Sequence, residues 1–208
     1  MGLLNLLLKD PLTFVLIALP LLYSVIFHEL AHGWVAYRMG DPTAKMMGRL
    51  SLNPLKHLDP VGTLMLFLFG FGWARPVPVN FANLRGSRKE LILVSSAGIV
   101  VNMILAFIAV FLLRFLSPSE HSIAHKMLYY MAQINIILAA FNLIPIPPLD
   151  GSKILMGFLS HRLQYSLSRL EPYGFFIIIG LLYFGALNPL IDFFRWIILS
   201  IIGLLLFK

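Results

Sequence analysis

Long apolar runs separated by short polar connections dominate this sequence. Residues 11–27 contain no charge, and the apolar pattern continues to Met39, where Gly40-Asp41-Pro42 ends it. Residues 91–113 are also uncharged, and as a helix this segment would be long enough to cross a hydrocarbon core of about 30 Å. Further apolar runs cover residues 127–149, 172–191 and 197–207. The pattern predicts an all-α polytopic membrane protein with about five to six transmembrane helices.

The connection between the first two predicted spans is irregular and basic. Residues 49–53 and 76–80 alternate polar and apolar positions, which predicts a loop region containing short β pieces. Residues 61–72 are apolar but too few to cross as a helix, so a re-entrant segment is expected rather than a further span. The positive-inside rule places this region on the cytoplasmic side. Its cations are Lys45, Arg49, Lys56, Arg75, Arg85, Arg88 and Lys89.

The composition agrees with a bilayer environment. Of the 208 residues, 59% are hydrophobic and 12% are charged, about half the charged fraction of a typical soluble domain. The net charge of +7 could suggest nucleic acid, but the cations are spread over the connections and are not gathered with aromatic residues. We therefore expect a lipid bilayer as partner and no nucleic acid. The length allows one membrane-embedded domain, residues 1–208, and the absence of cysteine excludes thiol chemistry.

The first apolar run contains an HExxH pattern, His28-Glu29-Leu30-Ala31-His32. In a helix, His28 and His32 lie one turn apart on the same face, so both imidazoles can bind one zinc ion. Glu29 lies on the adjoining flank, where it can accept a proton from a metal-bound water. The pattern predicts a hydrolytic zinc site. The alternative, three polar residues satisfied at a helix interface, is costly within a membrane unless each has a partner.

A catalytic zinc site usually has three protein ligands and one open position, so another His, Asp or Glu is expected. The chain has nine acidic residues, and apart from Glu29 all but one flank apolar runs or have a nearby partner. The exception is Asp150, which ends a proline-rich break at residues 145–148. Broken backbone at membrane depth is tolerated where it is buried in protein or lines a wet cavity. Asp150 is therefore the predicted third ligand, with a helix N-cap as its alternative role.

Other polar or small residues in the apolar runs have two interpretations each. Asn102 and Asn142 can form interhelical hydrogen bonds, the commoner use of Asn in a membrane, or Asn142 can be catalytic. Gly98 is either a packing glycine or part of the site. His121 and His125 also have i, i+4 spacing, but no Glu follows His121 and the predicted topology places the pair opposite the HExxH pattern.

Three separated blocks of the chain carry a family resemblance. They are Phe27-His28-Glu29-Leu30-Ala31-His32, Ala97-Gly98 with Asn102, and residues 142–151. In order and spacing they resemble the site-2 protease family of intramembrane zinc metalloproteases, in the compact form that lacks a PDZ domain. Where that family commonly has a proline after Ala-Gly, this chain has Ile99.

The resemblance implies one Zn²⁺ per chain, held by His28, His32 and Asp150, with Glu29 as the base. It implies a transmembrane protein substrate that is cut within or near its membrane-spanning segment, as in regulated intramembrane proteolysis. It further implies that Asn142 contacts the substrate or the developing oxyanion. The remaining implied substrate-binding residues are Asn102 and Gly98.

The expected location is a prokaryotic cell membrane, with the active site near the cytoplasmic side. Two other classes of protein stay open at this point. A non-proteolytic zinc transporter or metal-binding membrane protein would be expected to place ligands along a pathway on several helices. An inactive scaffold would bind a membrane partner and release no cleaved product.

Overall fold

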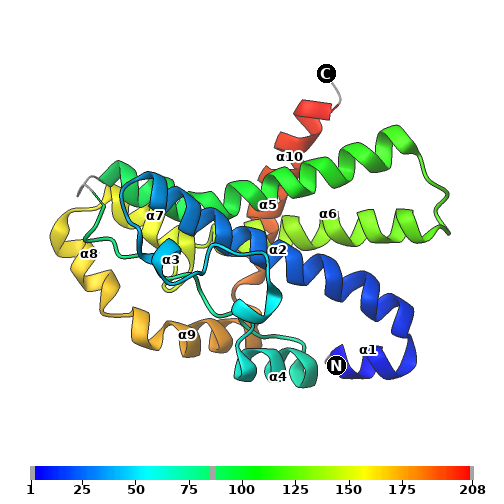
Figure 1. Cartoon of the computed structure of the whole chain (residues 1–208), viewed down its shortest axis with the longest axis horizontal. Coiled ribbons are helices and arrows are strands. Elements are labelled where there is room, and N and C mark those ends of the chain that lie inside the picture. The colour runs from blue at the N-terminus through cyan, green and yellow to red at the C-terminus, as the bar shows by residue number, and fades with distance from the viewer. Residues whose placement is uncertain (1–2, 85–87, 207–208) are drawn as a thin grey trace.

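The computed structural model of this chain describes residues 3–84 and 88–206 (Figure 1). Arg85 of the basic connection and Phe207 of the last apolar run lie outside the described residues. Within the described residues every regular element is a helix, as the apolar pattern predicted. The helices are α1 (Leu3–Lys9), α2 (Pro11–Arg38), α3 (Thr43–Met46), η1 (Pro54–Lys56), α4 (Pro60–Phe69), α5 (Arg88–Leu116), α6 (Ile123–Asn142), α7 (Asp150–Phe158), α8 (His161–Ser168), α9 (Glu171–Tyr183) and α10 (Asn188–Leu206).

Three of these helices, α2, α5 and α10, are long and apolar enough to cross a membrane. The predicted count of five to six spans is therefore not confirmed for the described part of the chain. Helix α6 has 20 residues but carries Lys126, Gln133 and Asn135, which lower its hydropathy. The apolar helices α4 and α9 have 10 and 13 residues, fewer than the roughly 20 that a spanning helix needs.

The predicted β pieces between the first two spans are not confirmed either. Residues 49–53 and 76–80 have irregular or extended backbone outside any strand, and the described residues hold one isolated bridge, between Leu58 and Ala74. Helix α4 lies between these two stretches and ends at Phe69, and the following Gly70 caps it with a φ of 81°, the left-handed conformation that glycine favours. The basic connection thus forms short helices and extended backbone packed beside α2.

Helix α5 is the centre of the bundle. It packs against α2, α6 and α7, while α10 packs mainly on α6 (Figure 1). The largest buried cluster joins α5, α6 and α10, and alanines provide much of its close contact. Small side chains let helices in a membrane approach closely, where hydrophobic burial gives little driving force. Its buried members are Ile99, Ala106, Ile136, Ala139, Ala140, Ile198 and Ile202.

The proline-rich break occurs where the sequence predicted it. Helix α6 ends at Asn142 and α7 begins at Asp150, because prolines in the intervening segment cannot donate the hydrogen bonds of a helix interior. A Cβ on Gly151 would lie 2.2 Å from the carbonyl oxygen of Leu143. The start of α7 is therefore so close to the end of α6 that position 151 has room for glycine alone. This close turn brings the first residue of α7 toward α2.

Candidate active site

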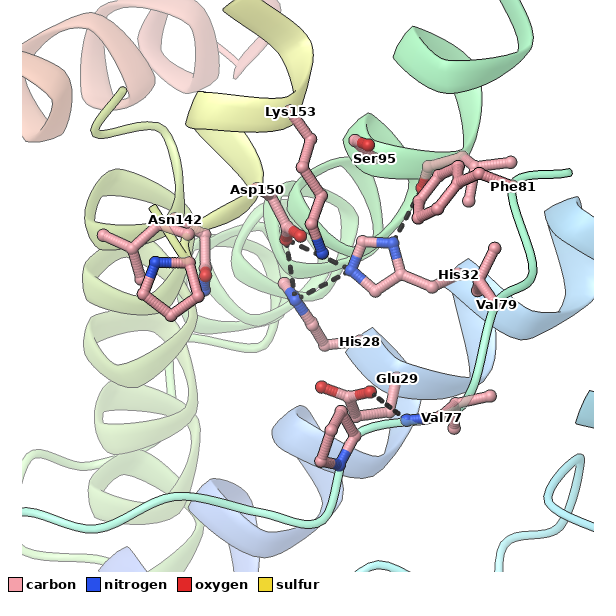
Figure 2. A pocket seen from close by; sticks show the side chains of 14 residues that line it. His28, Glu29, His32, Val77, Val79, Phe81, Ser95, Asn142, Asp150 and Lys153 are labelled. Carbon is pink, nitrogen blue, oxygen red and sulfur yellow. Dashed lines mark hydrogen bonds and ion pairs between the residues drawn. The ribbon is translucent and has the colours of Figure 1, made fainter. Parts of the chain in front are cut away.

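The HExxH residues lie in the second half of α2, where the helix packs on α5 (Figure 2). His28 and His32 are 7% and 8% exposed, and both rings point toward α5 and the start of α7. Glu29 is half-buried on the flank of the helix and lines a pocket together with both rings. The local helix therefore separates the two imidazoles from the carboxylate as its geometry predicts.

Asp150 completes a triangle of donor atoms with the two histidines. Its Oδ2 lies 3.1 Å from Nε2 of His28 and 3.1 Å from Nε2 of His32, and the two Nε2 atoms are 3.0 Å apart. Among the described residues, this is the group of His, Cys, Asp or Glu side chains close enough to hold a metal ion. Residues 118 positions apart in the sequence thus converge on one point.

The hydrogen bonds of the two rings fix which nitrogen faces this point. His32 Nδ1 lies 2.7 Å from the backbone carbonyl oxygen of Val94, which can only accept, so His32 donates from Nδ1. His28 Nδ1 lies 2.5 Å from Oδ1 of Asn102 and donates in the same way. In the neutral rings, both Nε2 atoms then carry lone pairs that face each other and the carboxylate of Asp150.

These residues fit a zinc ion. Two imidazole lone pairs and a carboxylate oxygen at such short separations repel one another unless a cation lies among them. Zn²⁺ accepts bonds of about 2.0–2.2 Å from His nitrogen and carboxylate oxygen, a range that donors 3.0–3.1 Å apart can satisfy together. Two His and one carboxylate are a common ligand set of catalytic zinc, which leaves a fourth position for water or substrate.

Residues 76–81 form a segment without helix or strand that lines the pocket beside the two histidines, and we call it the strap. The backbone N–H of Val77 donates to Oε2 of Glu29 at 2.7 Å (Figure 2). Farther along the strap, the backbone N–H of Asn80 donates to Oδ2 of Asp41, also at 2.7 Å. The strap is therefore attached to α2 at Glu29, and also to Asp41, which lies three residues after the last residue of α2.

Asp41 is fully buried and accepts several hydrogen bonds beyond the one from the strap. Its Oδ1 accepts from the side-chain amide of Asn83 at 2.8 Å and from both the backbone N–H and the hydroxyl of Thr43. Burial raises the pKa of Asp41, but these hydrogen bonds outweigh burial and hold the pKa below its usual value. The carboxylate is thus kept ionised where it ties the strap to the end of α2.

The pocket between the strap, α2 and α7 has a volume of about 330 Å³. Asn142 lines it and donates one Nδ2 hydrogen to the carbonyl of Leu138, which leaves its second hydrogen for another acceptor. Lys153, one turn after Asp150, reaches into the same pocket with its ammonium 5.8 Å from the ring centre of Phe81 on the strap (Figure 2). The pocket therefore holds hydrogen-bond donors as well as the predicted ligands.

Gly98 and Asn102, predicted to bind substrate, lie behind the imidazoles and not on the pocket wall. A Cβ on Gly98 would be 2.5 Å from Cε1 of His28, and Asn102 is 0% exposed with its amide between His28 and Asn135. Both residues stand on the face of α5 that packs against α2. The contacts of both residues that the structure shows are with the predicted ligands and with Asn135, and their predicted contact with a substrate stays a prediction.

Among the weaker histidine candidates, His125 stands in the first turn of α6, at the end opposite Asn142. Its Nδ1 lies 3.3 Å from the carbonyl oxygen of Pro118. His121 is exposed just before this helix. Neither histidine belongs to the metal-compatible group of the described residues.

Sequence reasoning missed several residues that shape the site. The spacing of Lys153 from Asp150, three residues along a helix, was available as a signal. The hydrogen bond from the strap to Glu29 could not be predicted from the sequence, because the donor is the backbone N–H of Val77, a group that nearly every residue has. Asn135, which bonds Asn102, resembles any interhelical Asn.

Comparisons with known proteins identify a matching family and several relatives. The profile of "Peptidase family M50" matches residues 16–124 and 117–184. The chain is 40% identical to "Putative zinc metalloprotease YwhC" of Bacillus subtilis, covering 88% of this chain and 85% of that protein. It is 31% identical to "Putative zinc metalloprotease Rip2" of Mycolicibacterium smegmatis, covering 84% of this chain and 69% of that protein. No solved protein structure matches the chain at a significant level.

Proposed function

Since this chain belongs to peptidase family M50, the site-2 protease family, and is a zinc metalloprotease, we propose that it hydrolyses peptide bonds within or near the membrane-spanning segments of protein substrates. The observation that carries the proposal is the convergence of His28, His32 and Asp150 beside Glu29, in a pocket within an apolar helical bundle. One domain, residues 1–208, would hold the whole site.

In this proposal His28, His32 and Asp150 hold the zinc ion. When bound, zinc lowers the pKa of a water and polarises the carbonyl of the peptide that is cut. Glu29 accepts the proton of the attacking water and later gives it to the leaving amine. The N–H of Val77 orients the carboxylate of Glu29 during both transfers. Asn142, with one amide hydrogen to spare, donates to the developing oxyanion.

An apolar pocket supports a membrane-spanning substrate. It has a volume of about 320 Å³ and lies along α2, with Leu22 and Val25 on its wall and α4 on its other side. Val25 is one helical turn before Glu29, so an apolar peptide lying in this pocket would end beside the site. The N–H of Val77 already donates to Glu29, so the backbone groups of the strap near Val79 would hold the unwound peptide by strand addition, which uses backbone hydrogen bonds.

The location proposed for the protein is a prokaryotic cell membrane with the site near the cytoplasmic side. Three apolar helices long enough to span support membrane integration. The cations of the basic connection support the orientation, because Lys and Arg are enriched in cytoplasmic loops. The strap belongs to this connection, so the pocket it covers would open toward the cytoplasm.

The test is cleavage by purified protein of single-span peptides, followed by the masses of the products, with and without a chelator. We expect Glu29→Gln to keep about one zinc ion per chain and to lower the cleavage rate by about 10²–10⁴-fold, the usual contribution of a general base. Glu171→Gln changes an exposed acid on α9 in the same way and should cleave like the wild type. Undiminished cleavage by Glu29→Gln would reject Glu29 as the base.

The same preparations separate the other classes of protein. A transporter would move zinc into vesicles and leave every peptide intact, and a scaffold would bind a peptide without cutting it. The described residues offer one compact metal-compatible group and no series of such groups along a pathway, which favours the protease. Zinc uptake without peptide cleavage would overturn the proposal.

A further inference from the structure

Buried polar side chains connect His28 to two neighbouring helices. Nδ1 of His28 meets Oδ1 of Asn102 on α5, and Nδ2 of Asn102 donates to Oδ1 of Asn135 on α6 at 2.8 Å. Nδ2 of Asn135 donates to the hydroxyl of Ser24 on α2 and to the backbone carbonyl of Met131, both at 2.8 Å. Both asparagines are 0% exposed, so water does not compete for these bonds.

The backbone carbonyl of Met131 determines which group donates and which accepts in each hydrogen bond from Asn135 through Asn102 to His28. A carbonyl oxygen can only accept, so the atom of Asn135 that faces Met131 must be the amide nitrogen. Its oxygen then faces Asn102, and Asn102 must turn its nitrogen toward it. The oxygen of Asn102 is left facing His28, which must carry its proton on Nδ1. The lone pair of Nε2 is therefore directed at His32 and Asp150.

We infer that Asn102 and Asn135 are positioning residues that fix the tautomer of His28 and thereby the zinc affinity of the site. The inference rests on the proposed role of His28 as a ligand. Without Asn135, the amide of Asn102 can turn its nitrogen toward His28, which moves the ring proton to Nε2 and blocks the metal-binding atom. Partners of a ligating histidine typically contribute 10-fold to 100-fold to metal affinity.

The experiment measures the zinc dissociation constant of purified protein by competition with a chromogenic chelator. Asn135→Leu should weaken zinc binding by about 10-fold to 100-fold. The double variant Asn102→Asp with Asn135→Leu should recover most of the affinity, because a carboxylate has only acceptors and cannot present a donor to His28. If Asn135→Leu gives no folded protein, Asn135→Ala with and without Asn102→Asp carries the same comparison.

Two control variants separate an effect on the tautomer of His28 from an effect on packing and from loss of the ligand itself. Ile136→Val removes a methylene from the neighbouring buried position of α6 and should leave zinc affinity within about twofold, since it changes packing alone. His28→Ala should lose zinc more severely than Asn135→Leu. Wild-type affinity in Asn135→Leu, or no recovery with Asn102→Asp, overturns the inference. Wild-type affinity in His28→Ala would instead overturn the proposed ligand set.

A separate observation concerns Ser95 on the pocket wall. Its hydroxyl is buried, with the residue 2% exposed, and has no hydrogen-bond partner among the described residues. A buried polar group without a partner is uncommon in proteins and needs an explanation. Ser95 lines the same pocket as His32 and Asp150 (Figure 2), whereas the adjacent Ser96 bonds the carbonyl of Leu93 in its own helix.

We propose that Ser95 binds the peptide substrate by donating its hydroxyl to a backbone carbonyl in the pocket. This rests on the proposed protease function, which requires cleavage by the wild type. Ser95→Ala should lower kcat/KM by about tenfold, as expected for one lost hydrogen bond, with unchanged zinc content. Ser96→Ala, the matched control, should cleave like the wild type. Unchanged kcat/KM in Ser95→Ala, or an equal loss in Ser96→Ala, would refute this role, whereas a wild type that cleaves nothing would refute the protease function itself.

Discussion

Gly98 lies directly against His32, such that a Cβ built on the glycine would be 2.4 Å from Nε2 of the imidazole. The same Cβ would be 2.6 Å from Nδ1 of His28. Neither ring can simply move away, because Val94 and Asn102 hold the two Nδ1 atoms. A hydrogen atom is therefore the largest substituent that leaves the metal-binding face of both rings in place.

Gly98→Ala should accordingly lower zinc affinity by at least about tenfold, because one or both imidazoles must rotate out of the ligand geometry. Zinc content after dialysis against a weak chelator measures the effect. Gly203→Ala is the matched control, since a Cβ at that position of α10 meets nothing within 4 Å. Full zinc retention in Gly98→Ala would mean that the rings tolerate displacement.

Val77→Pro removes the backbone N–H that orients Glu29 while leaving the carboxylate in place. Since a hydrogen bond to a charged group contributes about 1.5–3 kcal/mol, kcat should fall by roughly tenfold to 100-fold with zinc content unchanged. Val77→Ala also loses the buried side chain but keeps the N–H, so it isolates the backbone effect. Equal rates in the two variants would show that the bond does not serve catalysis.

The attachment of the strap should weaken in acid. The folded pKa of Asp41 lies below its usual value, so its stabilising contribution is complete above about pH 4 and is lost as pH falls through the lowered pKa. Asp41→Asn should therefore destabilise the protein by about 2 kcal/mol at pH 7 and by less below pH 4. Thermal unfolding in detergent from pH 3 to 7 measures the difference.

The control for this series is Asp192→Asn, which alters an exposed acid of α10 paired with Arg195 on the surface. Its unfolding curve should stay within about 0.5 kcal/mol of the wild type at each pH. A difference between Asp41→Asn and the wild type that is the same at pH 3 and pH 7 would contradict the ionised carboxylate as the attachment.

Zinc removal should destabilise the protein as well as inactivate it. A ligand that binds only the folded state stabilises it by about 2.7 kcal/mol at 100 times its dissociation constant, so a chelator should lower the Tm and added zinc should restore it. Mg²⁺ should not restore it, because it prefers oxygen ligands in octahedral geometry. Asp150→Ala should show a much smaller zinc-dependent shift. A chelator that leaves the Tm of the wild type unchanged would argue against a zinc ion held by the fold.

The parts of the site that sequence reasoning predicted are those set by local geometry or by elimination. The spacing of His28 and His32 fixes their common face because helix periodicity is local. Asp150 was identifiable because few acids occur in the apolar chain and this one follows a proline break. Gly98 and Asn102 lie against the two histidines, and whether they also contact a substrate depends on which face of α5 meets α2. The sequence does not specify how α5 is rotated about its own axis, because apolar residues occupy most of its faces and no single face is marked as the buried one.

By itself, the sequence determined that the chain is helical, that it is apolar enough for a membrane, and that an HExxH pattern, with two histidines on one face and a glutamate beside them, occupies the first long helix. Those features follow from runs of residues and from the 3.6-residue repeat, which act over a few turns. Only the tertiary structure decided that Asp150 meets both imidazoles, that Val77 donates to Glu29, and that Asn135 directs His28 through Asn102. Each of these contacts joins segments far apart in the chain, so its geometry depends on how whole helices pack and not on any local pattern.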